Sequence, residues 1–214
     1  VRDMVIVVLG RPRHEKLIAE LRSLGSSVRL ITDGDVNPCV ATGMSESGID
    51  MFLGIGGAPE GVLAAAALKC LGGVFEGRLV IENEQQRARA IGMGIGDPEA
   101  LLRHEDMVRG PCFFVASGVT DGPMLAGVRK IGPRTIVASL ALRSDTMTIR
   151  RFETSPADGS RESAHFRGAD SVLAVAGAAA GGGDVTTGCT SPVPPLAPGP
   201  TSPSPSIAAL RGRA

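Results

Sequence analysis

The amino-acid sequence predicts an α/β protein whose helices and sheets are stacked in layers. From residue 1 to about 152, short apolar runs typical of strands alternate with segments that have helical patterns. Glycine or proline stands at several of the expected element ends, where these residues start or stop helices. Three of the expected strands also end in loops that carry charged residues or glycine. These observations predict a layered α/β architecture.

The first expected strand covers residues 4–9 and is followed by a helix that Arg11-Pro12-Arg13 opens and Gly25 stops. A second strand at residues 28–31 runs into Thr32-Asp33-Gly34-Asp35. The apolar side chains of the first helix fall on one face, at Leu17, Ile18, Leu21 and Leu24.

A glycine-rich junction joins the third strand to the next helix. Residues 50–53 have the pattern of a short buried strand, and residues 62–71 are strong helix formers. Between them runs Gly54-Ile55-Gly56-Gly57-Ala58-Pro59-Glu60-Gly61. Pro59 fits the first helical position, and Gly72 fits the end of the helix. The free N–H groups of such a helix start attract an anion.

The rest of the first part of the chain is less regular. A buried strand at residues 111–116 ends in the loop Ser117-Gly118-Val119-Thr120-Asp121-Gly122. Two β-rich runs, 135–142 and 146–152, are joined across Arg143-Ser144-Asp145 and predict an antiparallel hairpin at a sheet edge. The other expected elements are a strand at 78–81 and helices at 36–42, 83–93 and 98–104.

Composition divides the chain into a domain of residues 1–153 and a tail of residues 154–214. The tail contains an Ala/Gly run at 174–183 and is dense in proline near its end. Because little apolar surface offsets the entropy of ordering such a segment, we expect the tail to be disordered. A linker or a proline-rich docking motif are the alternative interpretations.

Charge and composition exclude several classes of partner. The chain has 22 basic and 22 acidic side chains and no Trp or Tyr, which is unlike a nucleic-acid-binding protein. Its apolar runs fall short of the roughly 20 residues that a membrane helix needs, and no signal peptide is recognisable. We therefore expect a cytoplasmic protein with a small-molecule ligand and neither a nucleic-acid nor a membrane partner. We expect reduced thiols, because no C-x-x-C pair occurs among Cys39, Cys70, Cys112 and Cys189.

Three groups of polar residues follow expected strands, and ligands of open α/β sheets gather at that edge. Arg11 and Arg13 offer guanidinium groups for a phosphate. Asp33 and Asp35, around Gly34, offer carboxylates for hydroxyl groups or a cation. Glu60 lies in the first turn of a helix whose N–H groups attract a phosphate, but its carboxylate would repel that phosphate. A divalent cation between the two anions would remove this conflict. If the three strands are neighbours, the three groups form a sugar-phosphate site.

Each group also has a simpler interpretation. Arginine is common on protein surfaces, and Asp-Gly-Asp occurs in ordinary turns and helix caps. An acidic residue in a first helical turn is favoured by the helix dipole, by about 0.3–1 kcal/mol. His14 has the position of a helix-surface residue.

Other site types lack their residues in this sequence. The dinucleotide fingerprint requires glycine where Pro59 stands, and no Walker lysine follows the glycines. No Ser or Cys stands in a nucleophile elbow. The three histidines are scattered without metal-ligand spacing. A nucleotide-binding oxidoreductase domain is therefore a weaker alternative.

In order and spacing, five motifs resemble the class II fructose-bisphosphatases of the GlpX type, over residues 1 to about 153. The match is specific, and by this resemblance the enzymes of the family also act on sedoheptulose bisphosphate in photosynthetic bacteria. The motifs are Gly10-Arg11-Pro12-Arg13-His14, Thr32-Asp33-Gly34-Asp35-Val36, Gly54 to Val62, Ser117 to Gly122 and Ile149-Arg150-Arg151.

The resemblance implies a layered α/β sandwich of the lithium-sensitive phosphatase type with Mg²⁺ or Mn²⁺ as cofactor. It implies hydrolysis of the 1-phosphate of fructose-1,6-bisphosphate in gluconeogenesis, glycerol metabolism or the Calvin cycle, and we expect a homo-oligomer in the intact protein. By this likeness Glu60 is a metal ligand. The residues that would contact the substrate are Arg11, Pro12, Arg13, Asp33, Gly34, Asp35 and Gly57.

The sequence departs from the family at its beginning. Family members carry an amino-terminal half whose acidic residues supply most metal ligands, and no counterpart of that half is found in residues 1–214. Because the chain starts at Val1, we interpret it as a piece of a longer protein with little or no phosphatase activity by itself. The alternative is a non-catalytic domain that binds sugar phosphates or has a regulatory role.

Overall fold

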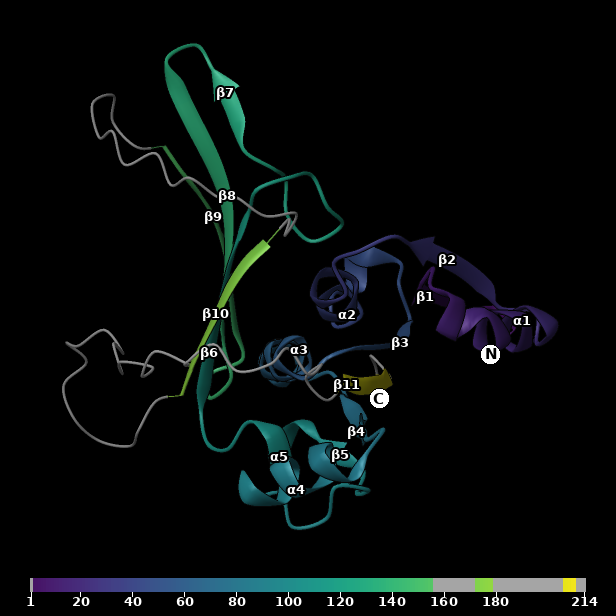
Figure 1. The fold of residues 1–214 in the computed structure, drawn as a ribbon. Helices are drawn as coiled ribbons and strands as arrows, with labels where there is room; N and C mark the ends of the chain where they lie inside the picture. Colours follow the sequence, from purple (N-terminus) through teal and green to yellow (C-terminus); the bar gives the residue numbers. More distant parts are fainter. Residues whose placement is uncertain (1, 156–171, 179–205, 211–214) are drawn as a thin grey trace.

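The computed structural model describes residues 2–155, 172–178 and 206–210, and shows two β-sheets with helices between and beside them. In Figure 1 helix α3 (Ala58–Leu71) lies between the first sheet and the second, and α1 (Glu15–Ser23) lies on the far side of the first sheet. The predicted α/β class is confirmed. The assignment to the sugar-phosphatase type of sandwich stays a prediction.

The first sheet contains the three strands that carry the predicted site loops. These are β1 (Val5–Leu9), β2 (Ser27–Ile31) and β3 (Met51–Gly57). β1 pairs in parallel with β2 from Val5↔Ser27 and with β3 from Ile6↔Met51. The three strands are therefore neighbours in the order β2-β1-β3, and their carboxyl ends share one edge.

Alternation along β1 buries both faces of this sheet. Ile6 and Val8 pack with Ile18 and Leu21 of α1, whereas Val7 and Leu9 belong to the cluster that includes α3. The predicted apolar face of the first helix is thus confirmed at its centre, while Leu24 is exposed. Because α1 and α3 cover the two faces of the sheet at β1, the polar residues next to this strand lie at its ends.

Helix α3 is buried from both sides. Ala64, Ala65 and Leu68 face the first sheet, and Ala66, Ala67 and Cys70 face the second. The small side chains allow both sheets to approach the helix closely.

The predicted ends of this helix are confirmed. Gly57 is the N-cap residue, Pro59 lies in the first turn, and Gly72 ends the helix with φ of 70°. Strand β3 extends further than expected, through the glycines to Gly57.

The second sheet contains β6 (Cys112–Gly118), β7 (Arg129–Ile131), β8 (Arg134–Arg143) and β9 (Thr148–Thr154). β8 pairs antiparallel with β6, β7 and β9. The predicted hairpin is confirmed as β8 and β9. Phe114, Leu140 and Leu142 point toward α3 and form the second part of the core.

Smaller elements complete the described chain. They are η1 (Pro12–His14), α2 (Val36–Ala41), η2 (Ser45–Ser47), β4 (Glu76–Val80), α4 (Glu84–Gly92), β5 (Leu102–Arg103) and α5 (His104–Met107). The helix expected at residues 98–104 is wrong. Asp97 accepts a hydrogen bond from the Glu99 N–H in a local turn, and β5 pairs with β4 instead.

Two strands form within the segment expected to be disordered, so that expectation is not confirmed. β10 (Val172–Ala178) pairs antiparallel with β6, and β11 (Ser206–Leu210) lies between β3 and β4. Both strands are made mostly of small apolar residues and complete hydrogen-bond ladders along the edges of other strands. The Ala/Gly run beyond 178 and the proline-dense stretch lie outside the described residues.

Candidate active site

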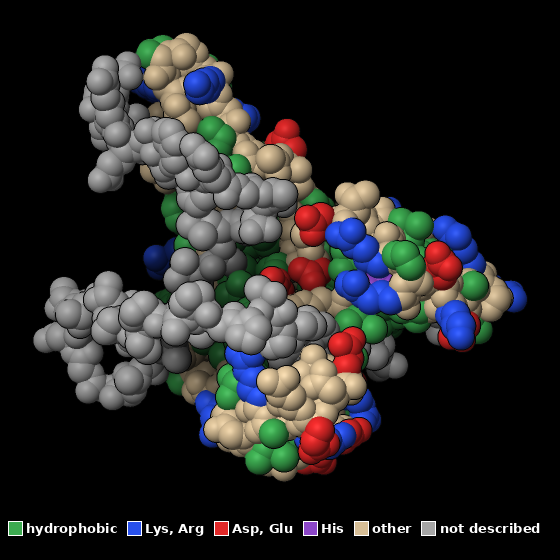
Figure 2. Space-filling view, viewed as in Figure 1, with side chains coloured by type: hydrophobic (Ala, Val, Ile, Leu, Met, Phe, Trp, Pro, Cys, Tyr) green, Lys and Arg blue, Asp and Glu red, His purple; other side chains and the backbone are tan. Residues whose placement is uncertain are grey.

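The three predicted loops meet at the carboxyl edge of the parallel strands. Arg11–Arg13 follows β1, Asp33–Asp35 follows β2, and Gly57 leads into Glu60 after β3. On the face shown in Figure 2, acidic side chains lie in a central hollow, and basic side chains gather beside it. The tertiary structure therefore satisfies the condition on which the predicted sugar-phosphate site depended.

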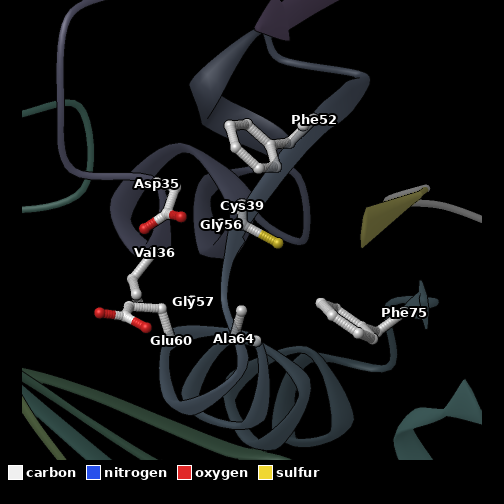
Figure 3. Close-up of a pocket in the computed structure, with 11 residues that line it drawn as sticks. Asp35, Val36, Cys39, Phe52, Gly56, Gly57, Glu60, Ala64 and Phe75 are labelled. Atoms are coloured by element: carbon white, nitrogen blue, oxygen red, sulfur yellow. The ribbon is translucent and has the colours of Figure 1, made fainter. Parts of the chain in front are cut away.

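A small cavity lies beneath this edge. Asp35, Gly56, Gly57 and Glu60 line it on one side, and Figure 3 shows the carboxylates of Asp35 and Glu60 on that side and the rings of Phe52 and Phe75 away from them. Its volume is about 20 Å³, which is room for about one water molecule. A sugar phosphate would therefore have to lie across the loops rather than inside the cavity.

The glycines of the junction make room for carboxylates of the same site. A Cβ atom on Gly56 would collide with Oδ2 of Asp35, and one on Gly57 would collide with Oε2 of Glu60. Both glycines have ordinary backbone conformations, and a side chain at either position would require the facing carboxylate to turn away. Side chains of the chain itself therefore occupy the space beside both glycines.

The electrostatics of the site concentrate on Asp35. Burial raises the pKa of this carboxyl above its usual value, and the nearby charges of Glu60 and Asp33 raise it further, against two backbone hydrogen bonds. Asp35 holds the N-cap position of α2, yet its side chain makes no capping hydrogen bond. A carboxylate pair with no cation is unfavourable, so the pair would gain from a bound cation.

Cys39 is a structural neighbour rather than a nucleophile. Burial raises the pKa of its thiol to about 12, and the charge of Asp35 adds to this effect. The thiolate is the reactive form of cysteine, so a neutral buried thiol is inert.

Arg13 and His14 attach the first loop to β3. The guanidinium of Arg13 donates to the Ile55 carbonyl oxygen at 2.6 Å, and the Ile55 N–H donates to Nε2 of His14 at 3.0 Å. His14 is only 1% exposed, so its interpretation as a helix-surface residue is wrong. The 3₁₀ turn η1 directs the ring inward, and the hydrophilic residues around His14 gave no sign of this in the sequence.

The remaining predicted residues lie around the cavity without lining it. Pro12 is in the first position of η1, and the exposed Arg11 is its N-cap residue. Oδ1 of Asp33 accepts from the Gly34 N–H, as in an ordinary turn, and Gly34 has a φ of 78°. Of the predicted residues, those that the structure brings to the cavity are Asp35, Gly57 and Glu60.

The loop after β6 reaches the site region through α2. The amide of Asn37 lies against Gly122, and the Asp121 carboxylate accepts from the Gly127 N–H. Asn37 is buried beside Asp35 in sequence, and its Oδ1 has no hydrogen-bond partner in the described part of the chain. No pattern in the sequence singled it out.

The described residues do not complete a site for the metal that the family resemblance implies. Asp35 at the N-cap of α2 and Glu60 in the first turn of α3 are two neighbouring carboxylates, but no group of three His, Cys, Asp or Glu side chains able to hold a metal occurs in residues 2–155, 172–178 and 206–210. Mg²⁺ requires a nearly octahedral shell of oxygen ligands. The pair can supply only part of such a shell.

Comparison with known proteins identifies the family. The family model for bacterial fructose-1,6-bisphosphatase, glpX-encoded, matches residues 1–156. The chain belongs to this family. It is 38% identical over 167 residues to the D-fructose 1,6-bisphosphatase class 2/sedoheptulose 1,7-bisphosphatase of Crocosphaera subtropica. Two Synechococcus proteins with the same name are 38% and 37% identical over the same length.

The chain aligns with only part of each of these relatives. In each of these three comparisons the alignment includes 72% of this chain and 48% of the relative. The chain thus spans about half the length of the curated relatives it matches. Among the described residues, no helix has the length and apolar character needed to span a membrane.

Proposed function

We propose that the protein acts on sugar bisphosphates as a phosphatase, releasing phosphate from fructose-1,6-bisphosphate and, as the names of its relatives suggest, from sedoheptulose-1,7-bisphosphate. The observation that carries this proposal is the meeting of three polar loops at the carboxyl edge of β2-β1-β3, in a chain of the glpX family. A planar guanidinium suits a phosphate, and paired carboxylates suit sugar hydroxyls. Both kinds of group stand at that edge.

Each loop has a proposed task. Arg11, Pro12 and Arg13 bind a phosphate, with the exposed guanidinium groups as donors. Asp33, Gly34 and Asp35 bind the sugar. Gly57 contacts the substrate at the start of α3, where free backbone N–H groups and the helix dipole favour an anion.

Glu60 is proposed as one ligand of Mn²⁺ or Mg²⁺. Its carboxylate stands beside that of Asp35, and the mutual repulsion of the pair is what a cation would relieve. Because the described residues supply too few ligands, the remaining ones would come from outside them.

The wider assignments are proposals as well. Residues 1–153 would form the phosphatase unit, and the protein would act in the cytoplasm in sugar-phosphate metabolism such as gluconeogenesis or the Calvin cycle. The intact protein would be a homo-oligomer.

A second candidate function is binding of sugar phosphates without hydrolysis. The observation that favours it is the incomplete carboxylate set in the described residues. Calorimetric titration of residues 1–214 with fructose-1,6-bisphosphate, with and without Mn²⁺, tests binding, and release of inorganic phosphate by the intact protein tests hydrolysis.

The two measurements separate the candidates. Binding with metal-dependent phosphate release supports the phosphatase. Binding without release supports the binding domain. Absence of both would contradict the proposed site.

A further inference from the structure

The backbone ladder between β1 and β3 ends before the site begins. Its last pair is Val8↔Leu53. On the other side of β1, the Gly10 N–H still donates to the Ile31 carbonyl oxygen at the end of β2. Strand β3 nevertheless continues to Gly57. The backbone groups of Ile55 that face this side are partly buried and need partners other than β1.

Two consecutive side chains take that place. Nε2 of His14 accepts from the Ile55 N–H at 3.0 Å, and the guanidinium of Arg13 donates to the Ile55 carbonyl at 2.6 Å. Both polar groups of Ile55 are therefore held by η1, the turn that follows β1. Ile55 lies between Gly54 and Gly56, in the middle of the glycine-rich junction.

The chemistry of these contacts determines the state of the His14 ring. A backbone N–H can only donate, so Nε2 must be the unprotonated acceptor. Nδ1 lies 2.7 Å from the Leu9 carbonyl oxygen, which can only accept, so Nδ1 carries the hydrogen. The ring is neutral and joins the carboxyl ends of β1 and β3 through two hydrogen bonds.

We propose that His14 is a positioning residue that, together with Arg13, holds the Gly54–Gly57 end of β3 against the arginine turn. This inference deepens the proposed function and rests on it. Arg13 keeps further N–H donors in addition to the one used on Ile55. The contact that holds Ile55 therefore also determines where the guanidinium stands relative to the start of α3, so that a single phosphate can meet both.

The experiment compares His14→Leu and His14→Gln with the wild-type chain, and uses Ile18→Ala as the matched control. Ile18 belongs to the core between α1 and β1, so its truncation destabilises the same region without touching Ile55. Nitrogen-15 spectra report the tautomer of His14, and amide hydrogen exchange reports the protection of Ile55. Calorimetry with inorganic phosphate and with fructose-1,6-bisphosphate reports binding.

We expect wild-type His14 to be protonated at Nδ1. In His14→Leu, exchange at Ile55 should be faster by about 10-fold, the factor that corresponds to one lost hydrogen bond. The amides of the β1–β2 ladder should keep their rates. Phosphate and fructose-1,6-bisphosphate should bind about 10-fold more weakly for the same reason. His14→Gln should recover part of both effects, because its amide oxygen can accept from Ile55.

Several outcomes would overturn the inference. One is a wild-type ring protonated at Nε2; another is an Ile55 exchange rate that His14→Leu changes no more than Ile18→Ala does. Faster exchange with unchanged ligand affinity would exclude the positioning role. If His14→Leu does not fold, the tautomer of the wild-type ring and the Ile55 exchange rate and ligand affinity of His14→Gln test the inference. If the wild type binds neither ligand, the proposed function fails, while the exchange rates still test the link to Ile55.

Discussion

The sheet of parallel strands β1, β2 and β3 and the antiparallel strands β6 and β8 pack on opposite faces of α3, but the predicted site residues gather only at the parallel set. Parallel strands send all their following loops to one edge, so residues far apart in sequence meet there. Antiparallel strands alternate in direction, and β8 and β9 are joined by a short turn instead. Strand direction thus separates the region suited to ligand binding from the region that supports it.

The outer faces of the two sheets also differ. The outer face of the first sheet is covered by α1. The second sheet exposes Phe113, Val115 and Phe152, with Phe113 40% exposed and in contact with the Arg143 guanidinium. These side chains belong to no predicted motif of the site. The four predictions below test whether the second sheet contributes stability and the first sheet contributes binding.

The largest effect is expected from Phe114→Ala in the second sheet. Phe114 is 0% exposed in the core between β6 and α3, and its truncation should lower the free energy of unfolding by about 3–5 kcal/mol. Urea unfolding measures this loss. The folded fraction should keep the wild-type affinity for fructose-1,6-bisphosphate, and a specific loss of affinity would break the comparison.

Arg13→Ala should do the reverse. The side chain and its hydrogen bond to the Ile55 carbonyl oxygen are exposed, so the free energy of unfolding should fall much less than in Phe114→Ala, whereas loss of a charged hydrogen bond should weaken fructose-1,6-bisphosphate binding by about 1–3 kcal/mol. Titration calorimetry measures the affinity. Arg29→Ala, which removes an exposed arginine from β2, is the matched control and should leave affinity unchanged. Equal affinities in the two variants would remove Arg13 from the site.

Glu60→Gln should weaken Mn²⁺ binding by at least about 10-fold. Loss of a residue that merely hydrogen-bonds to a metal ligand already has an effect of this size, and loss of the ligand itself should have no less. Glu15→Gln is a close control, because Glu15 also stands in the first turn of a helix. If Glu60 served only the helix dipole, both variants would lose about 0.3–1 kcal/mol of stability and keep any Mn²⁺ affinity. That result would exclude the metal-ligand role.

The smallest effect is expected from Asp35→Asn. Burial and the charge of Glu60 raise the folded-state pKa of Asp35, so the Asp35 carboxylate binds a proton more tightly in the folded protein than in the unfolded chain. The protonated carboxyl favours folding at low pH, and this contribution is lost as pH rises through the raised pKa. Asp35→Asn should therefore be more stable than the wild type at neutral pH, with a difference that shrinks in acid. Thermal unfolding across pH measures it, and a constant difference would contradict the raised pKa.

Local signals predicted the elements whose ends depend on backbone chemistry. Pro59 and Gly72 mark the limits of α3 because a fixed φ suits a helix start and a left-handed residue suits its end. The hairpin of β8 and β9 followed from two β-rich runs on either side of a short polar turn. For both, the residues that determine the geometry are neighbours in sequence.

Other features depended on contacts between distant residues and were missed. His14 is surrounded by polar residues in sequence, yet its ring is buried because Leu9 and Ile55 offer it partners. The strands β10 and β11 consist mostly of small apolar residues, and they form where the edges of other strands accept their backbone. The composition of a segment does not show which distant residues its backbone and side chains will bind.

The sequence by itself determined the α/β class, the ends of α3 and the residue types of the three loops, since these follow from patterns and backbone preferences within short segments. Only the tertiary structure decided that β1 lies between β2 and β3, that Asp35 and Glu60 occupy the space beside Gly56 and Gly57, and that His14 joins two strand ends. These features are pairings between residues as many as 45 apart in sequence, as for Ile6 and Met51. They depend on which strands become neighbours, and the sequence of a short segment does not determine this.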